Sequence, residues 1–181
     1  MAVIFFLYAL QYPVESVQMM NEIVYSAEKF QKLHPDLIGM GHGRRIFASM
    51  NIMDDKDQRD ANASIAKASV TAANKHNVKV ILVISPDDSP LSKFVSAYRP
   101  DVPIVVFCSS SKVGRQLIIY RGIHPVVRQF HDVLPGKRPA RAIQYAKELG
   151  FIQAGDDVVI VCVDSDADVG DLLTMKICSC K

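Results

Sequence analysis

The feature that most constrains the fold of this chain is the alternation of short apolar runs with helical segments downstream of Asn77. Five runs have the length and β-branched composition of strands, and they cover residues 78–85, 102–108, 123–127, 157–163 and 172–178. Three helices fit between them, at 89–98, 112–120 and 137–149. Near-continuous apolar strands that alternate with helices are typical of a parallel sheet covered on both faces. Because no helix separates the last two runs, the last strand should run antiparallel. The sequence therefore predicts an α/β fold, a three-layer sandwich whose five-stranded sheet is mostly parallel.

Two further helices are predicted upstream of these runs. Apolar residues recur at spacings of three and four from Pro13, and this helix should stop before Pro35, because the residue ahead of a proline avoids helical geometry. A second helix fits 58–76, where many small residues indicate close packing against a neighbour. Residues 37–57 have no clear period and are interpreted as a connecting segment. The apolar run 1–10 is much shorter than the ~20 residues of a membrane span and lacks the features of a signal peptide, so no membrane association is expected.

Composition excludes several classes of function. The 181 residues include 21 Lys and Arg against 19 Asp and Glu, so the net charge of +2 gives no basic face for nucleic acid. None of the four cysteines has C-x-x-C spacing, which argues against a disulfide framework and against a zinc site. Free thiols indicate a reducing compartment, and a cytoplasmic location is predicted.

The motifs in the chain offer no catalytic centre and no metal site. The glycine-rich stretch 39–45 follows no strand and lacks the third glycine of a dinucleotide loop, and no P-loop sequence occurs. The acidic stretch 164–171 resembles the start of a calcium loop, but Val169 and Met175 stand where an EF-hand needs glycine and glutamate. We interpret this stretch as a turn between two strands. The five histidines are scattered, so neither a catalytic residue nor a metal ligand is predicted.

Two loops at the carboxyl ends of predicted strands are candidates for ligand binding. Residues 85–89 and 109–111 precede helices, whose free N–H groups favour anions, and open α/β sheets take ligands at this edge. However, Asp87 and Asp88 place negative charge in the first loop, and the acidic stretch 164–171 is expected near it. Carboxylates repel phosphate by roughly 4 kcal/mol per close pair in a partly dry site. The residues themselves therefore leave a ligand site open but disfavour phosphate.

Several segments together resemble the pyruvate kinase family. They are YPVESVQMM at 12–20, ANASIAKASVTAA at 61–73, ILVIS at 81–85, AYRPDVPIVV at 97–106, YRGIHPVV at 120–127 and the segment 142–161, which contains AKELGFI. The resemblance covers about residues 12–175 and corresponds to the family's C-terminal domain plus the last helix of its catalytic barrel. It implies that 1–35 is the residual last segment of the barrel, 36–57 a connecting segment and 58–181 the C-terminal α/β domain.

This resemblance implies an activity for the complete enzyme and none for this chain. The family transfers a phosphoryl group from phosphoenolpyruvate to ADP in the last step of glycolysis, with Mg²⁺ and usually K⁺. Its catalytic residues and metal ligands belong to the barrel, which should precede Tyr12. We therefore expect no cofactor in this chain and predict that the chain alone is inactive.

The family's C-terminal domain also binds effectors, in many members a sugar bisphosphate, between the loop after its first strand and the loop joining its last two strands. The resemblance assigns to this site Ser85, Asp87, Asp88, Ser89, Ser92, Asp166, Asp168 and Gly170. The first loop is acidic where the family has glycine and hydroxyl residues, and the second lacks the family's basic and glycine-rich pattern. A small phosphorylated effector is therefore disfavoured, and we expect activation by a sugar bisphosphate to be lost or replaced.

The same family pairs its C-terminal domains across a two-fold axis, through a helix and an edge strand. The matching edge strand here carries Leu172, Leu173, Met175 and Ile177. Exposed apolar edges tend to be covered by a partner, so a homo-oligomer is expected. Three interpretations stay open: a fragment of a pyruvate kinase, a stand-alone non-catalytic module that binds a small ligand or a kinase subunit, and a degenerate paralogue retained for association.

Overall fold

The computed structural model of the chain describes residues 11–33, 56–87, 89–128, 130, 133–166 and 170–180. The chain divides into two compact units, Met1–Ile46 and Phe47–Lys181. The predicted segment 1–10 and most of the predicted connecting segment 36–57 lie outside the described residues, as do Asp88 and Asp168.

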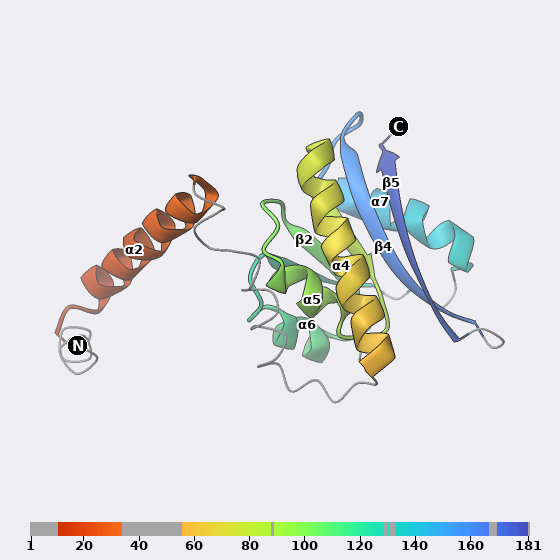
Figure 1. Cartoon of the computed structure of the whole chain (residues 1–181), viewed down its shortest axis with the longest axis horizontal. Coiled ribbons are helices and arrows are strands. Elements are labelled where there is room, and N and C mark those ends of the chain that lie inside the picture. Colours follow the sequence, from red (N-terminus) through yellow and green to blue (C-terminus); the bar gives the residue numbers. More distant parts are fainter. Residues whose placement is uncertain are drawn as a thin grey trace. The chain divides into compact units, whose positions relative to one another are not determined.

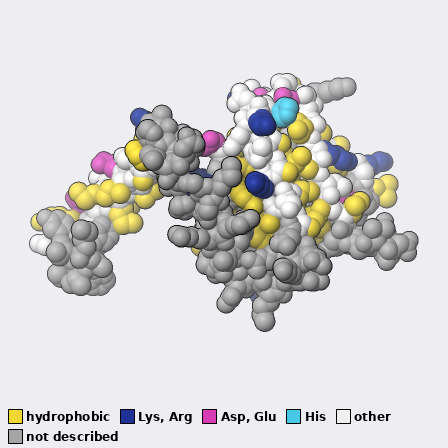
Figure 2. Space-filling model, in the orientation of Figure 1, with side chains coloured by type: hydrophobic (Ala, Val, Ile, Leu, Met, Phe, Trp, Pro, Cys, Tyr) yellow, Lys and Arg dark blue, Asp and Glu magenta, His cyan; other side chains and the backbone are white. Residues whose placement is uncertain are grey.

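The described residues of the first unit form one long helix, α2 (Pro13–Leu33), in agreement with the helix predicted from Pro13 (Figure 1). Proline suits the first helical turn because its missing N–H would have no partner there, and Glu15 in the same turn favours the positive end of the helix dipole. Large apolar side chains of this helix are exposed, among them Val17, Ile23 and Val24. Figure 2 shows this apolar surface along the helix.

The second unit is built on one five-stranded sheet in the order β3-β2-β1-β4-β5. Its strands are β1 (Val80–Ile84), β2 (Ile104–Cys108), β3 (Ile123–Val127), β4 (Asp157–Asp166) and β5 (Gly170–Ser179). The central strand β1 runs parallel to β2 and to β4, β2 runs parallel to β3, and β4 pairs antiparallel with β5. The predicted mixed sheet with an antiparallel last strand is therefore confirmed.

Helices cover both faces of this sheet (Figure 1). On one face pack α4 (Lys56–His76), α5 (Leu91–Ala97) and α6 (Ser111–Leu117), and their apolar side chains form one core cluster with the strands. On the other face, α7 (Arg138–Glu148) follows the short 3₁₀ helix η2 (Pro135–Lys137) and buries Ala142 and Ala146 in a second cluster. Ala66, Ser69 and Ala73 of α4 are buried, so the small residues of this helix do pack closely. The three-layer prediction is confirmed.

Helix ends follow the local chemistry of the chain. Asn77 and Gly150 have positive φ angles of 51° and 77° and stand just beyond α4 and α7, where a left-handed residue commonly terminates a helix. The side chain of Ser110 accepts a hydrogen bond from the Val113 N–H and so caps α6. However, the helix predicted at 112–120 stops at Leu117, because a turn that includes Gly122 brings β3 alongside β2.

The hairpin β4–β5 is longer than predicted. Pairing continues through Asp164 opposite Leu172 and Asp166 opposite Gly170, so the stretch interpreted as a loop, 164–171, is strand at both of its ends. The physical reason is that antiparallel pairing uses backbone groups, which the acidic residues supply as well as apolar ones do.

Candidate functional site

A cavity of about 420 Å³ lies at the carboxyl ends of β1, β2 and β3. The segment after β1 contributes Ser85 to Asp87, and the end of β2 contributes Phe107 to Ser109. Arg128 and Phe130 follow β3, Arg138 begins α7, and Ile84 completes the lining. Carboxyl ends of neighbouring parallel strands are where open α/β sheets bind ligands, so the cavity is the candidate functional site.

Asp87 ties together the segments that follow β1 and β2. Its carboxylate accepts a hydrogen bond from the Ser109 backbone N–H at 2.9 Å and another from the Ser109 hydroxyl. Hydrogen bonds to an ionised carboxylate are among the stronger ones in proteins. Ser109 lines the cavity, and both its backbone N–H and its hydroxyl therefore already donate to a carboxylate of the chain itself.

Arg138, at the start of α7, makes a corresponding contact with a second carboxylate. Its guanidinium forms a 2.5 Å ion pair with the Asp164 carboxylate, and its Nε donates to the Val133 carbonyl at 3.2 Å. The two side chains are only 23% and 21% exposed, so water screens this pair less than it would a surface pair. Ile84 pairs with Cys162 across parallel strands, which places Asp164, two residues further along β4, at the same edge of the sheet as Asp87.

The second arginine of the cavity, Arg128, lies against an aromatic ring. The Arg128 guanidinium is 5.5 Å from the centroid of the Tyr145 ring, and it donates to the Val127 carbonyl at 2.9 Å. Tyr145 in turn contacts Phe130 edge-on, and Phe130 meets Phe107 edge-on with centroids 5.2 Å apart. The cavity thus has one apolar aromatic wall and a set of charged and hydroxyl groups.

Cys108 lines the cavity as a protonated thiol. Burial raises its pKa above the ordinary value, and the negative charge of Asp87 raises that pKa further. Its Sγ lies 3.7 Å from the Val126 carbonyl oxygen, to which the thiol donates a weak hydrogen bond. Because the thiolate is the reactive form, this cysteine is a poor nucleophile at neutral pH.

The structure brings only some of the predicted effector residues to this cavity. Ser85 and Asp87 line it, whereas Ser89 and Ser92 line a much smaller adjoining pocket. The Ser89 hydroxyl accepts a hydrogen bond from the Leu91 N–H at the start of α5, and Ser92 is buried. Asp166 and Gly170 pair with each other at the far end of the hairpin.

Sequence reasoning missed the two arginines of the cavity. Arg128 directly follows the predicted strand 123–127, and Arg138 stands at the start of the predicted helix 137–149. The position of Arg128 after a strand is a signal that could have been used, since such residues gather at one edge of a parallel sheet. Arg138 reaches the cavity only because α7 covers the face of the sheet opposite α5 and α6.

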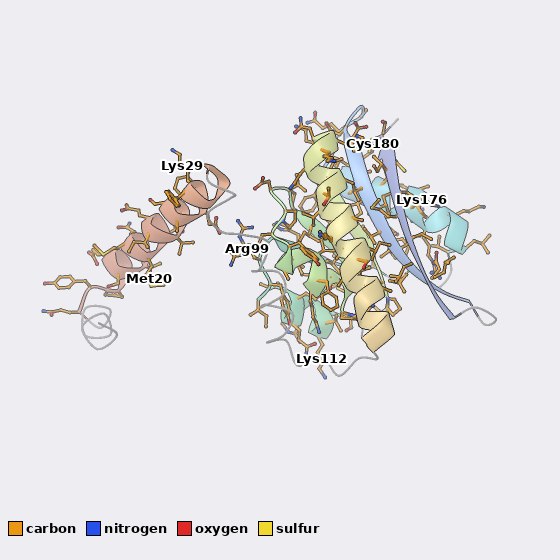
Figure 3. All side chains as sticks on the ribbon, in the orientation of Figure 1. Met20, Lys29, Arg99, Lys112, Lys176 and Cys180 are labelled. Atoms are coloured by element: carbon orange, nitrogen blue, oxygen red, sulfur yellow. The ribbon has the colours of Figure 1, made fainter. Side chains whose placement is uncertain are left out.

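The four predicted edge-strand residues all lie on β5, one of the two outer strands of the sheet. Leu173 and Met175 pack against the core cluster on the α4 face. Leu172 and Ile177 are 50% and 43% exposed. The edge therefore offers apolar side chains to solvent together with the exposed Lys176, which is labelled in Figure 3.

The part of the chain that the structure describes also bears on metal binding and on membrane insertion. There, no group of three or more His, Cys, Asp or Glu side chains is placed to hold a metal ion. None of the helices in that part has the length and apolar character needed to cross a membrane.

Comparisons with known proteins agree on one family. The family described as "Pyruvate kinase, alpha/beta domain" matches residues 63–178. Pyruvate kinases of the yeasts Debaryomyces hansenii and Candida albicans are 28% and 30% identical, each over 83% of this chain and 28% of the relative. A solved structure of Cryptosporidium parvum pyruvate kinase in complex with ADP has a TM-score of 0.61 and 26% identity, over 77% of this chain and 27% of that one. The chain thus spans little more than a quarter of these relatives, and it belongs to the pyruvate kinase family through its C-terminal α/β domain.

Proposed function

We propose that this chain serves subunit association in a pyruvate kinase, with β5 pairing against the β5 of a second copy. The observation that carries this proposal is the outer position of β5, which among the described residues pairs with β4 alone and exposes Leu172 and Ile177. An unpaired edge presents a row of backbone donors and acceptors that a second strand can satisfy. A two-fold axis makes the same edge available on both copies, so one surface provides both halves of the interface.

Sedimentation of the purified chain at tens of micromolar tests this association. We expect a dimer for the natural sequence and a monomer for the double variant Leu172→Lys with Ile177→Lys, because the substitutions would place four added positive charges along one interface. The matched control is Ile119→Lys, at an 81% exposed apolar residue in the turn that follows α6. This control should remain dimeric. A natural chain that sediments as a clean monomer would exclude association through β5.

We also propose that the chain by itself does not transfer the phosphoryl group between phosphoenolpyruvate and ADP. The family match is to the alpha/beta domain, and the relatives are more than three times longer than the matched part. A coupled assay of pyruvate formation with the pure chain, Mg²⁺ and K⁺ should stay at the background rate. Turnover that scales with the concentration of the chain would contradict this proposal.

A second function, the binding of a small effector, is favoured by the cavity. Two arginines, two serines and an aromatic wall line a space of about 420 Å³, a size typical of small-molecule sites. The acidic neighbours Asp87 and Asp164 oppose a bisphosphate, so we propose that sugar-bisphosphate activation is absent from the natural chain. Thermal shift with a panel of sugar phosphates, nucleotides and amino acids tests ligand binding. A saturable isotherm with fructose 1,6-bisphosphate would refute the absence of that activator.

A further inference from the structure

Two carboxylates from different parts of the chain bind donor groups at the same cavity. Asp87, after β1, accepts both hydrogen bonds that Ser109 can donate. Asp164, near the end of β4, holds Arg138 through the 2.5 Å ion pair. Backbone N–H groups, hydroxyls and guanidinium groups are the donors with which proteins bind phosphate and carboxylate ligands. Here both Ser109 donors and the Arg138 guanidinium already have an anionic partner.

The charges around the cavity compensate one another. Arg128 and Arg138 contribute two positive charges to the lining, while Asp87 in the lining and Asp164 on Arg138 contribute two negative charges. An incoming phosphate would exchange one anion for another at Arg138 and would gain no new ion pair there. The Asp164 carboxylate also competes with phosphate for Arg138 at a high effective concentration, because both side chains belong to the same folded chain.

We propose that Asp87 and Asp164 are built-in anionic ligands of this cavity, which take the Ser109 donors and the Arg138 guanidinium from any phosphorylated compound. Loss of the Asp164 charge then turns the cavity into a phosphate-binding site centred on Arg138. This inference rests on the proposal that the cavity is a ligand site. It assigns opposite roles to two parts of that site: Arg138 attracts the anion, and Asp164 excludes it.

Calorimetric titration of the full chain with inorganic phosphate, and separately with fructose 1,6-bisphosphate, tests the inference. The variant Asp164→Asn removes one charge and keeps a hydrogen-bond acceptor of the same shape. Its control is Asp157→Asn, which makes the same change of net charge at the opposite end of β4, where Asp157 accepts a hydrogen bond from Ser179. If Asp164→Asn lowers the melting temperature too far for titration, Asp164→Ser repeats the test with a smaller side chain.

We expect Asp164→Asn to bind fructose 1,6-bisphosphate at least tenfold more tightly than the natural chain, which is about 1.4 kcal/mol. Asp157→Asn should behave as the natural chain does, and adding Arg138→Gln to Asp164→Asn should abolish the gain. Equal affinities for Asp164→Asn and Asp157→Asn would overturn the inference. So would tight binding by the natural chain, although the proposed ligand site would then survive. If neither the titrations nor the thermal-shift panel detect binding of any compound to any variant, the ligand site itself is rejected.

Discussion

Replacing Phe107 by alanine should strongly destabilise the second unit, because this ring joins the strand core to the wall of the cavity. The side chain is 3% exposed and meets the Phe130 ring edge-on at 5.2 Å. Core Phe→Ala substitutions cost about 3–5 kcal/mol. The adjoining cavity gives the neighbours room to relax, so we expect about 3 kcal/mol, a large share of the typical 5–15 kcal/mol stability of a domain. Phe107→Leu keeps most of the volume and should cost about 1 kcal/mol.

Urea unfolding of four proteins isolates the aromatic contribution: the natural chain, Phe107→Leu, Phe130→Leu and the double variant. Edge-to-face pairs contribute about 0.5–1.5 kcal/mol beyond their buried area, so the double-mutant cycle should return a coupling energy in that range. Ile119→Ala, at an exposed position, serves as the control and should change the free energy of unfolding by less than about 0.5 kcal/mol. A Phe107→Ala loss below about 1 kcal/mol, or a coupling energy of zero, would refute the packing described for this wall.

Two further predictions concern backbone strain and pH. Gly150 has φ 77° and open space around its Cα, so Gly150→Ala should lower the free energy of unfolding by about 1 kcal/mol through backbone strain alone. The control Gly136→Ala, also in open space but at an ordinary φ, should not lower it. Equal losses for the two variants in urea unfolding would contradict this prediction. Burial, with a smaller contribution from Asp164, raises the pKa of Cys162 to about 11 from 9.0. The folded state therefore keeps this thiol protonated at pH values where the unfolded chain loses the proton, so stability should fall as the pH rises from 9 to 11. The fall should be shallower in Cys162→Val, and identical pH profiles for the two proteins would show that the thiol does not titrate as described.

The sheet could be predicted from the sequence because each strand carries its signal locally. The runs that become β1 and β2 are wholly apolar, rich in β-branched residues and buried over their full length, so composition alone identifies them. Asn77 and Gly150 marked helix ends because few other residues adopt a left-handed backbone there. The hairpin was predicted too short, since each of its last pairs contains an acidic residue, whose side chain gives no strand signal.

The cavity could be predicted only in part, because it is made by residues far apart in the chain. Ser85 and Asp87 were found from their position after the first strand of the sheet. Arg128 and Arg138 required the strand order and the face that α7 covers, and no local pattern specifies either. The ion pair between Arg138 and Asp164 depends on both the strand order and the position of α7, and it neutralises one of the two positive charges in the cavity lining.

The central place of β1 has a consequence for the order in which the chain folds. Its partner β2 follows after one short helix, but its other partner β4 comes much later, with Val80 pairing with Val158. During synthesis, β1, β2 and β3 emerge first, and one side of β1 stays open until β4 has left the ribosome. Long-range parallel pairing of this kind is slow, because the entropy of closing the intervening segment is lost before the contacts form. The hairpin β4–β5 is local and can form by itself, so its docking onto the waiting edge of β1 is the step at which a nascent chain is most exposed to aggregation.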